Sequence, residues 1–252
     1  MDSYEYEAIY EQVYKQGKHA WHAGVSKGLT GYLPSLDGVI QTGNVASEIP
    51  LGLVEIPIKN IVGTYTHSRS IAFAQNFMPL MPTKSEFASK WMHLYQAHIE
   101  EGIRDPIKVY EYYNLFYVVE GNKRVSVLKS VDATSIYANV TRLVPKKDDH
   151  DITNRIYYEF MDFYNKTGIN SIWFSAPGRF KELEQYLDKY NPKLEEYEEK
   201  SKYFMADIYR PFRTIYHSLG GDKRHITTGD AFINYIKIYG MPSVINQSHE
   251  DS

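Results

Sequence analysis

The stretch from Tyr117 to Val131 constrains the fold most, because the clearest strand of the chain passes there directly into a helix. Residues 117–119 end a β-branched and aromatic run, which predicts a strand. Gly121 permits a sharp turn, and Asn122 is a favoured N-cap residue. The apolar positions that follow recur at helical spacing: Val125, Leu128 and Val131. This join predicts a sheet with a helix packed against it.

Lys123 and Arg124 are unexpected at this helix start. The first turn of a helix carries free backbone N–H groups and the positive end of the helix dipole, so cations are disfavoured there. A bound phosphate would reverse that effect, since it would accept from the N–H groups and pair with the cations. The alternative is a solvated helix start whose cations point into water or meet Glu120. We expect the phosphate site, and Glu120 is then the nearest carboxylate for catalysis or for holding Mg²⁺ against the phosphates.

A second loop places another cation at a helix start. Residues 63–70 are rich in hydroxyl groups and contain one His and one Arg, and Ser68 is expected to cap a helix that runs through Phe77. Arg69 would then lie in the first turn of that helix. Two helix starts facing one anion are therefore predicted, with these phosphate-binding candidates: Thr64, Thr66, His67, Ser68, Arg69, Gly121, Asn122, Lys123 and Arg124.

The charge distribution agrees with an anion site in the middle of the chain. The net charge is −3, which argues against a strongly basic nucleic-acid surface. Residues 51–149 carry twelve Lys and Arg against ten Asp and Glu, whereas both flanking segments carry an excess of anions. The absence of cysteine excludes disulfides, thiolate metal sites and thiol catalysis within this chain. The start lacks the pattern of a signal peptide, and no apolar run approaches the ~20 residues of a membrane span, so a cytoplasmic protein is expected.

The other elements follow from periodicity and turn residues. Thr83 and Glu86 form a capping box, Pro57 interrupts an apolar strand, and residues 41–48 have the composition of a polar loop. The predicted helices cover residues 4–27, 83–102, 156–167, 180–202 and 231–239. The predicted strands cover residues 51–62, 105–112, 115–119 and 135–144, the middle two forming a hairpin around Tyr113 and Asn114.

A charged linker at residues 145–151 is the best domain boundary in the chain. We therefore expect a helical N-terminal extension at 1–50, a central domain at 51–149 and a mainly helical region at 150–252. The strand-to-helix turn and the Arg69 loop both lie in the central domain. The fold class is predicted to be α+β, with a small mixed sheet and packed helices.

In this order of elements, residues 51–145 resemble the ParB/sulfiredoxin superfamily. The turn Gly121-Asn-Lys-Arg124 matches the Gly-x-x-Arg signature of such domains. Gly102-Ile followed by Pro106-Ile-Lys-Val109 resembles their usual join into the hairpin. Residues 1–50 and 150–252 are similar to the flanks of uncharacterised bacterial ParB-like proteins, which bring no known activity.

The resemblance implies that the turn binds the phosphates of a nucleoside di- or triphosphate, with or without Mg²⁺. The superfamily includes CTP-binding partition proteins, ATP-dependent sulfinic acid reductases, free serine kinases and nucleases. The reductases use a cysteine where this chain has Asn122, and the serine kinases use an acidic residue in the loop that is Gly63–Ser70 here. Partition proteins carry a DNA-reading helix-turn-helix and a Glu-Asn-x-Gln-Arg motif that are not found in this sequence. The phosphate-binding turn is the feature that remains.

Three functions stay open at this point. The first is a nucleotide-binding protein that acts as a switch or as a phosphotransfer enzyme. The second is a DNA-binding or DNA-cleaving protein, which rests on fold analogy alone. The third is a non-catalytic module that binds a partner protein through its aromatic helices. A homodimer is compatible with each of them, and no membrane partner is expected.

Overall fold

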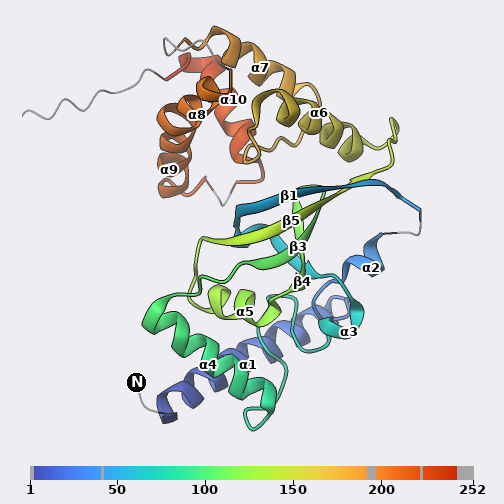
Figure 1. Cartoon of the computed structure of the whole chain (residues 1–252), viewed down its shortest axis with the longest axis vertical. Coiled ribbons are helices and arrows are strands. Elements are labelled where there is room, and N and C mark those ends of the chain that lie inside the picture. The colour runs from blue at the N-terminus through green and yellow to red at the C-terminus, as the bar shows by residue number, and fades with distance from the viewer. Residues whose placement is uncertain (1–2, 41–42, 192–196, 222–223, 243–252) are drawn as a thin grey trace, which may run out of the picture. The chain divides into compact units, whose positions relative to one another are not determined.

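A computed structural model of the chain describes residues 3–40, 43–191, 197–221 and 224–242 (Figure 1). The chain divides into two compact units, residues 1–146 and 147–252. The boundary lies within the linker that the sequence indicates. Residues 1–50 do not form a separate extension, because the N-terminal helix packs within the first unit and the first strand begins at Val45.

A five-stranded mixed sheet forms the centre of the first unit, in the order β1-β5-β3-β4-β2. The strands are β1 (Val45–Pro57), β2 (Ile61–Thr64), β3 (Ile107–Tyr112), β4 (Leu115–Glu120) and β5 (Ser135–Pro145). The pairs β1–β5 and β3–β4 are antiparallel, whereas β3–β5 and β2–β4 are parallel. The predicted α+β class and the hairpin around Tyr113 and Asn114 are therefore confirmed.

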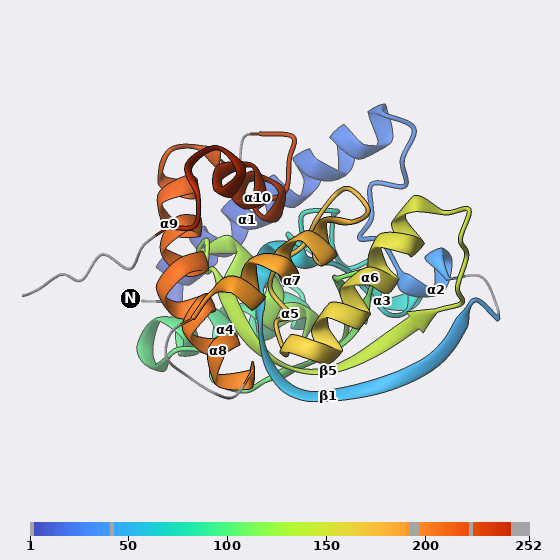
Figure 2. The same ribbon diagram turned by 90° about the horizontal axis from the view of Figure 1, so that it is seen from above.

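The first predicted strand is wrong in its bounds. It is split, because β1 ends at Pro57 and a 3-10 turn, Ile58–Asn60, separates it from β2. The expected polar loop at 41–48 is also wrong over residues 45–48, where β1 pairs with the far end of β5 from Val45 onward, while residues 41–42 lie outside the described part. Figure 2 shows β1 and β5 running side by side as one long curved ribbon. A partner strand contributed by distant residues thus overrides the polar composition of this segment.

The helices of the first unit lie on one another and on the sheet. They are α1 (Ser3–Ser26), α2 (Leu36–Val39), α3 (His67–Ser70), α4 (Glu86–Glu101) and α5 (Asn122–Ser130). Val125 and Leu128 of α5 pack into the core of the sheet, as their spacing predicts. Val127 faces the other way, into a cluster with Tyr10 of α1 and Trp91 of α4. The first unit is thus layered as sheet, α5, and then α1 with α4 (Figure 1).

The helix starts differ from the predicted caps. Ser85 replaces Thr83 as the N-cap of α4, and its Oγ accepts from the backbone N–H of Ala88 at 3.1 Å. The helix expected from Ser68 through Phe77 is only the short α3, with Thr66 at its N-cap. Phe77 has a φ of 65°, which no right-handed helix contains.

The second unit is mainly helical, as predicted. Its helices are α6 (Ile152–Thr167), α7 (Arg179–Lys189), α8 (Tyr197–Tyr203), a π-helical turn (Phe204–Tyr209), α9 (Arg210–Ser218) and α10 (Thr228–Tyr239). The single helix expected at 180–202 is wrong, since α7 ends at Lys189, and residues 192–196 lie outside the described part. The core is aromatic and includes Phe160, Phe180 and Phe232. Among the described residues, no helix is both long enough and apolar enough to cross a membrane.

Candidate functional site

The turn between β4 and α5 requires glycine for two independent reasons. Gly121 is the N-cap residue of α5 and has φ 110° and ψ 19°, a conformation that residues with a side chain rarely adopt. A Cβ atom at this position would lie 2.5 Å from Cγ2 of Ile107, on β3. The backbone of the turn is therefore pressed against the neighbouring strand, and its N–H groups begin the helix at a defined place.

Asn122 is the first residue of α5 rather than its cap, which corrects the expectation from sequence. Its side chain is turned inward, where Nδ2 donates to Thr64 Oγ1 at 3.0 Å. Thr64 in turn donates to the carbonyl of Val118 at 3.0 Å, so its Oγ1 acts as an acceptor toward Asn122. Asn122 is only 9% exposed, and its Oδ1 has no hydrogen-bond partner within the described part of the chain. A buried acceptor of this kind is uncommon in folded proteins and calls for an explanation, such as a bound ligand, ion or water molecule that it contacts.

Arg69 reaches the same turn from α3. Its guanidinium donates to the carbonyl of Val119, near the end of β4. The helix that carries it is tied to α2, because the N–H of His67 donates to Asp37 Oδ2 at 3.0 Å. That bond is the main reason why the pKa of Asp37 lies below its ordinary value. No carboxylate among the described residues lies within ion-pair distance of Arg69, and the charge of Arg69 contributes to lowering the pKa of Glu120 below its ordinary value.

Lys123 is the second cation at the turn. Its Nζ lies 4.5 Å from the centre of the Phe87 ring, which belongs to α4. Burial lowers the pKa of Lys123 below its ordinary value, the ammonium of Lys90 lowers it further, and the carboxylate of Glu86 opposes both effects. Glu86 itself pairs with Lys90 at 2.6 Å. No ion pair of Lys123 is formed within the described residues.

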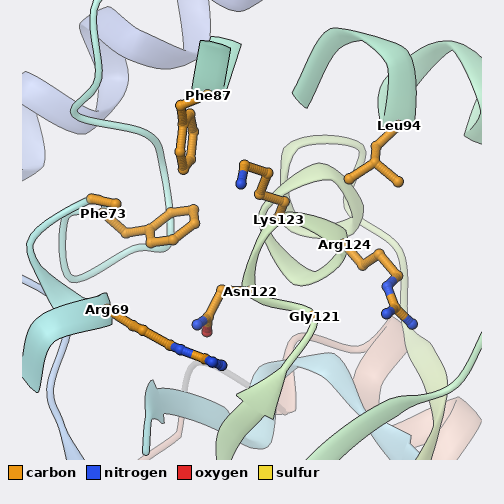
Figure 3. Close-up of a pocket in the computed structure, with 9 residues that line it drawn as sticks. Arg69, Phe73, Phe87, Leu94, Gly121, Asn122, Lys123 and Arg124 are labelled. Carbon is orange, nitrogen blue, oxygen red and sulfur yellow. The ribbon is translucent and has the colours of Figure 1, made fainter. Parts of the chain in front are cut away.

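These groups surround a cavity of about 380 Å³. It is lined by Arg69, Ala72, Phe73, Phe87, Leu94, Gly121, Asn122, Lys123 and Arg124. Figure 3 shows the ends of Arg69 and Asn122 pointing toward one another, with Lys123 beside the rings of Phe73 and Phe87. The cavity therefore has one end formed by Arg69 and the start of α5, and an aromatic end where Lys123 lies beside the rings.

Arg124 has a different role from that of Lys123. Its Nη1 donates to the carbonyl oxygens of Asp105 and Pro106, at 3.0 and 2.7 Å. Its Nη2 lies 3.9 Å from Glu120 Oε1. In Figure 3 its side chain leaves the helix on the side away from Arg69 and Asn122. Arg124 lines the edge of the cavity, but its guanidinium holds the segment that leads into β3.

Glu120 is engaged outside the cavity. Its Oε2 lies 2.9 Å from Lys108 Nζ, and this contact is the main reason why the pKa of Glu120 is below its ordinary value. The carboxylate therefore pairs with Lys108 and Arg124, and not with Lys123. No group of three or more His, Asp or Glu side chains that could hold a metal ion is found in the described part of the chain.

Of the candidates taken from the sequence, Arg69 and residues 121–124 line the cavity. Thr64 is fully buried below it and acts through Asn122. Thr66, His67 and Ser68 do not line it. The apolar lining residues were not predicted, since Phe87 and Leu94 belong to the ordinary apolar pattern of α4 and only the packing of α4 on α5 brings them here.

Comparison with known proteins adds a likeness of fold. No protein-family model matches the chain, and no curated protein matches it. A crystal structure of sulfiredoxin from Arabidopsis thaliana is similar over 35% of this chain and 82% of that one, with 23% sequence identity and a TM-score of 0.25. This likeness concerns the fold alone.

Proposed function

We propose that this protein binds a phosphorylated small molecule, of the size of a nucleotide, at the N-terminus of α5. The observation that carries the proposal is the pair of cations Arg69 and Lys123, which line one cavity at a helix start and have no ion-pair partner among the described residues. Two such cations beside the positive end of a helix dipole repel one another and the helix. A phosphate group removes that repulsion and accepts from the free N–H groups of the first turn.

The buried amide of Asn122 is a second feature that favours a ligand at the N-terminus of α5. Its Nδ2 is fixed by Thr64, so the orientation of the amide is set by the end of β2. Holding an acceptor without a partner costs about 1–3 kcal/mol of stability. Such a cost is typical of positions where a protein keeps a polar group ready for a ligand or for a neighbouring side chain that moves on binding. Arg69, whose end lies next to this amide in Figure 3, is the side chain that would move.

A small molecule fits the cavity better than a nucleic acid does. Its volume of about 380 Å³ lies within the ordinary range of small-molecule sites. Phe73, Phe87, Ala72 and Leu94 give the cavity an apolar wall, whereas a DNA backbone requires a row of cations along an open surface. The open roles of switch and phosphotransfer enzyme share this binding step, whereas a non-catalytic module that binds a partner protein through its aromatic helices does not require it.

The test is a thermal-shift screen followed by calorimetry on the full chain, with nucleoside mono-, di- and triphosphates. A ligand that binds the folded state raises the apparent melting temperature. Arg69→Gln and Lys123→Gln should each weaken binding about tenfold or more, since a charge-assisted hydrogen bond contributes roughly 1.5–3 kcal/mol. Matched controls are Arg104→Gln and Lys84→Gln, which remove exposed cations that do not line the cavity and should bind as the parent does.

Two results would defeat the proposal. One is a parent protein that binds no phosphorylated compound at millimolar concentration. The other is a parent that binds one while Arg69→Gln and Lys123→Gln bind it equally well. DNA binding that falls steeply with salt and is lost in the same variants would favour the nucleic-acid alternative instead.

A further inference from the structure

The cavity offers no carboxylate to a divalent cation. The only oxygen-bearing side chain among its nine lining residues is that of Asn122, and the charged ones are all cations. The nearest acidic residue along the chain, Glu120, pairs with Lys108 at 2.9 Å and lies 3.9 Å from Arg124. Mg²⁺ is ordinarily bound through one or two carboxylates together with the phosphates of its ligand. At this site it would meet Arg69, Lys123 and the positive end of α5 instead.

The charge of the site indicates how much phosphate it accepts. Arg69 and Lys123 contribute one positive charge each, and a helix N-terminus contributes roughly half a charge. Arg124 is left out of this sum, because its side chain leaves the helix away from Arg69 and Asn122 and donates to the carbonyl oxygens of Asp105 and Pro106. The total of about +2.5 matches a monophosphate, which carries close to two negative charges at neutral pH, or a diphosphate, which carries about one more. A triphosphate, with about one negative charge more again, would leave more than one negative charge without a partner.

The apolar end of the cavity indicates what is attached to the phosphate. Phe73 and Phe87 lie 5.3 Å apart between ring centres and meet edge to face, and Ala72 and Leu94 complete the apolar wall. A flat ring packs well on such a wall, whereas inorganic phosphate leaves it empty. Lys123 extends over this aromatic end, since its ammonium lies 4.5 Å from the centre of the Phe87 ring.

Resting on the proposed function, we infer that the ligand is a nucleoside mono- or diphosphate bound in its metal-free form. The protein itself neutralises the phosphates, through Arg69, Lys123 and the N–H groups of α5. Mg²⁺ then competes with the protein for the same phosphate oxygens. This arrangement separates the site from Mg²⁺-nucleotide sites, in which the metal joins protein carboxylates to the phosphates.

The experiment is titration calorimetry of the full chain with AMP, ADP, ATP and inorganic pyrophosphate, each in EDTA and in excess Mg²⁺. In EDTA, ADP should bind at least as tightly as ATP and about tenfold more tightly than pyrophosphate, because only ADP fills the apolar end. Excess Mg²⁺ should weaken ADP binding about tenfold, the effect of losing one charge-assisted contact. Glu120→Gln should leave the response to Mg²⁺ unchanged.

The outcomes separate this inference from the function on which it rests. A nucleotide that binds tenfold more tightly with Mg²⁺ than in EDTA would overturn the metal-free form while leaving nucleotide binding intact. Pyrophosphate that binds as tightly as ADP would overturn the role of the aromatic wall. Absence of binding by all four compounds in both buffers would overturn the proposed function and the inference together.

Discussion

Asn122 Nδ2 donates a hydrogen bond to Thr64 Oγ1 at 3.0 Å, and this contact joins the first turn of α5 to the end of β2. The two residues are 58 positions apart in the chain. Because Thr64 also donates to the carbonyl of Val118, one hydroxyl connects two parallel strands and the helix start. The orientation of the candidate site therefore depends on a buried residue that no ligand needs to touch.

Thr64→Val keeps the size of this residue and removes its hydroxyl. It leaves the Asn122 amide N–H without an acceptor in a buried position, so we expect a loss of about 1–3 kcal/mol in the free energy of unfolding. Urea unfolding measures this loss. Ser68→Ala, which removes an exposed hydroxyl, is the control and should change stability by less than ~0.5 kcal/mol. Equal stability of the two variants would show that the Thr64–Asn122 bond contributes nothing.

Gly121→Ala should destabilise the first unit more than a positive φ alone explains. Gly121 and Gly168 both lie in the left-handed region, at φ 110° and ψ 19° and at φ 69° and ψ 0°, but only Gly121 has a neighbour, Ile107, within 2.5 Å of the new Cβ. Backbone strain of this kind costs about 1–3 kcal/mol, and the overlap with Ile107 adds to it. Gly168→Ala, with open space around its Cβ, isolates the strain. If both variants lose the same stability, the close packing of the turn against β3 is unimportant.

The buried ion pair between Glu111 and Arg142 should stabilise the centre of the sheet. Both side chains are 1% exposed, and they lie on neighbouring strands β3 and β5. Glu111 Oε1 also accepts from the N–H of Asn114 at 2.6 Å, which ties the pair to the hairpin turn. Arg142→Met removes the guanidinium that faces the buried carboxylate of Glu111, so a loss of about 3–5 kcal/mol is expected.

A double-mutant cycle with Glu111→Gln tests the coupling of this pair. The double variant should lose clearly less stability than the sum of the two single losses. Strict additivity would mean that the two residues stabilise the sheet independently.

Arg124→Ala should reduce the stability of the fold. The sequence alone favours a purely ligand-directed role, but the guanidinium donates to the carbonyl groups of Asp105 and Pro106. Losing charge-assisted hydrogen bonds of this type costs roughly 1.5–3 kcal/mol each. Arg69→Ala, whose side chain is exposed and holds one carbonyl, should lose less. Urea unfolding of the two variants side by side would contradict this assignment if Arg69→Ala were the less stable.

Nucleotide binding should weaken at alkaline pH through Lys123. Its pKa in the free protein is lowered by burial and by Lys90, against the opposing effect of Glu86. A bound phosphate favours the protonated amine and raises this pKa, so affinity is full below the free-state pKa and falls as pH rises through it. Calorimetry of the parent and of Lys123→Gln at increasing pH tests this, since the variant lacks the amine. If Lys123→Gln loses affinity at alkaline pH to the same extent as the parent, a group other than Lys123 is responsible for the pH dependence.

The local sequence pattern was sufficient to predict much of the fold. The β4 run, the positive-φ glycine and the α5 stripe are contiguous in the chain, so their local preferences agree with the tertiary structure. The hairpin around Tyr113 and Asn114 and the helical character of the second unit have the same origin. The cationic helix start at Lys123 also stands out in the sequence, because it breaks a rule about helix dipoles.

The tertiary structure decided which cation serves the cavity and which supports the fold. Lys123 and Arg124 are adjacent in the chain, yet one lies over the Phe87 ring and the other donates to carbonyl groups 18 and 19 residues away. Successive residues on a helix point about 100° apart, so neighbours of like charge meet different surroundings. The surroundings of each side chain depend on how α4 and the segment before β3 pack against α5. The residues of the turn by themselves do not determine that packing. The extension of β1 back to Val45 has the same cause, since its partner strand is supplied by residues almost a hundred positions later.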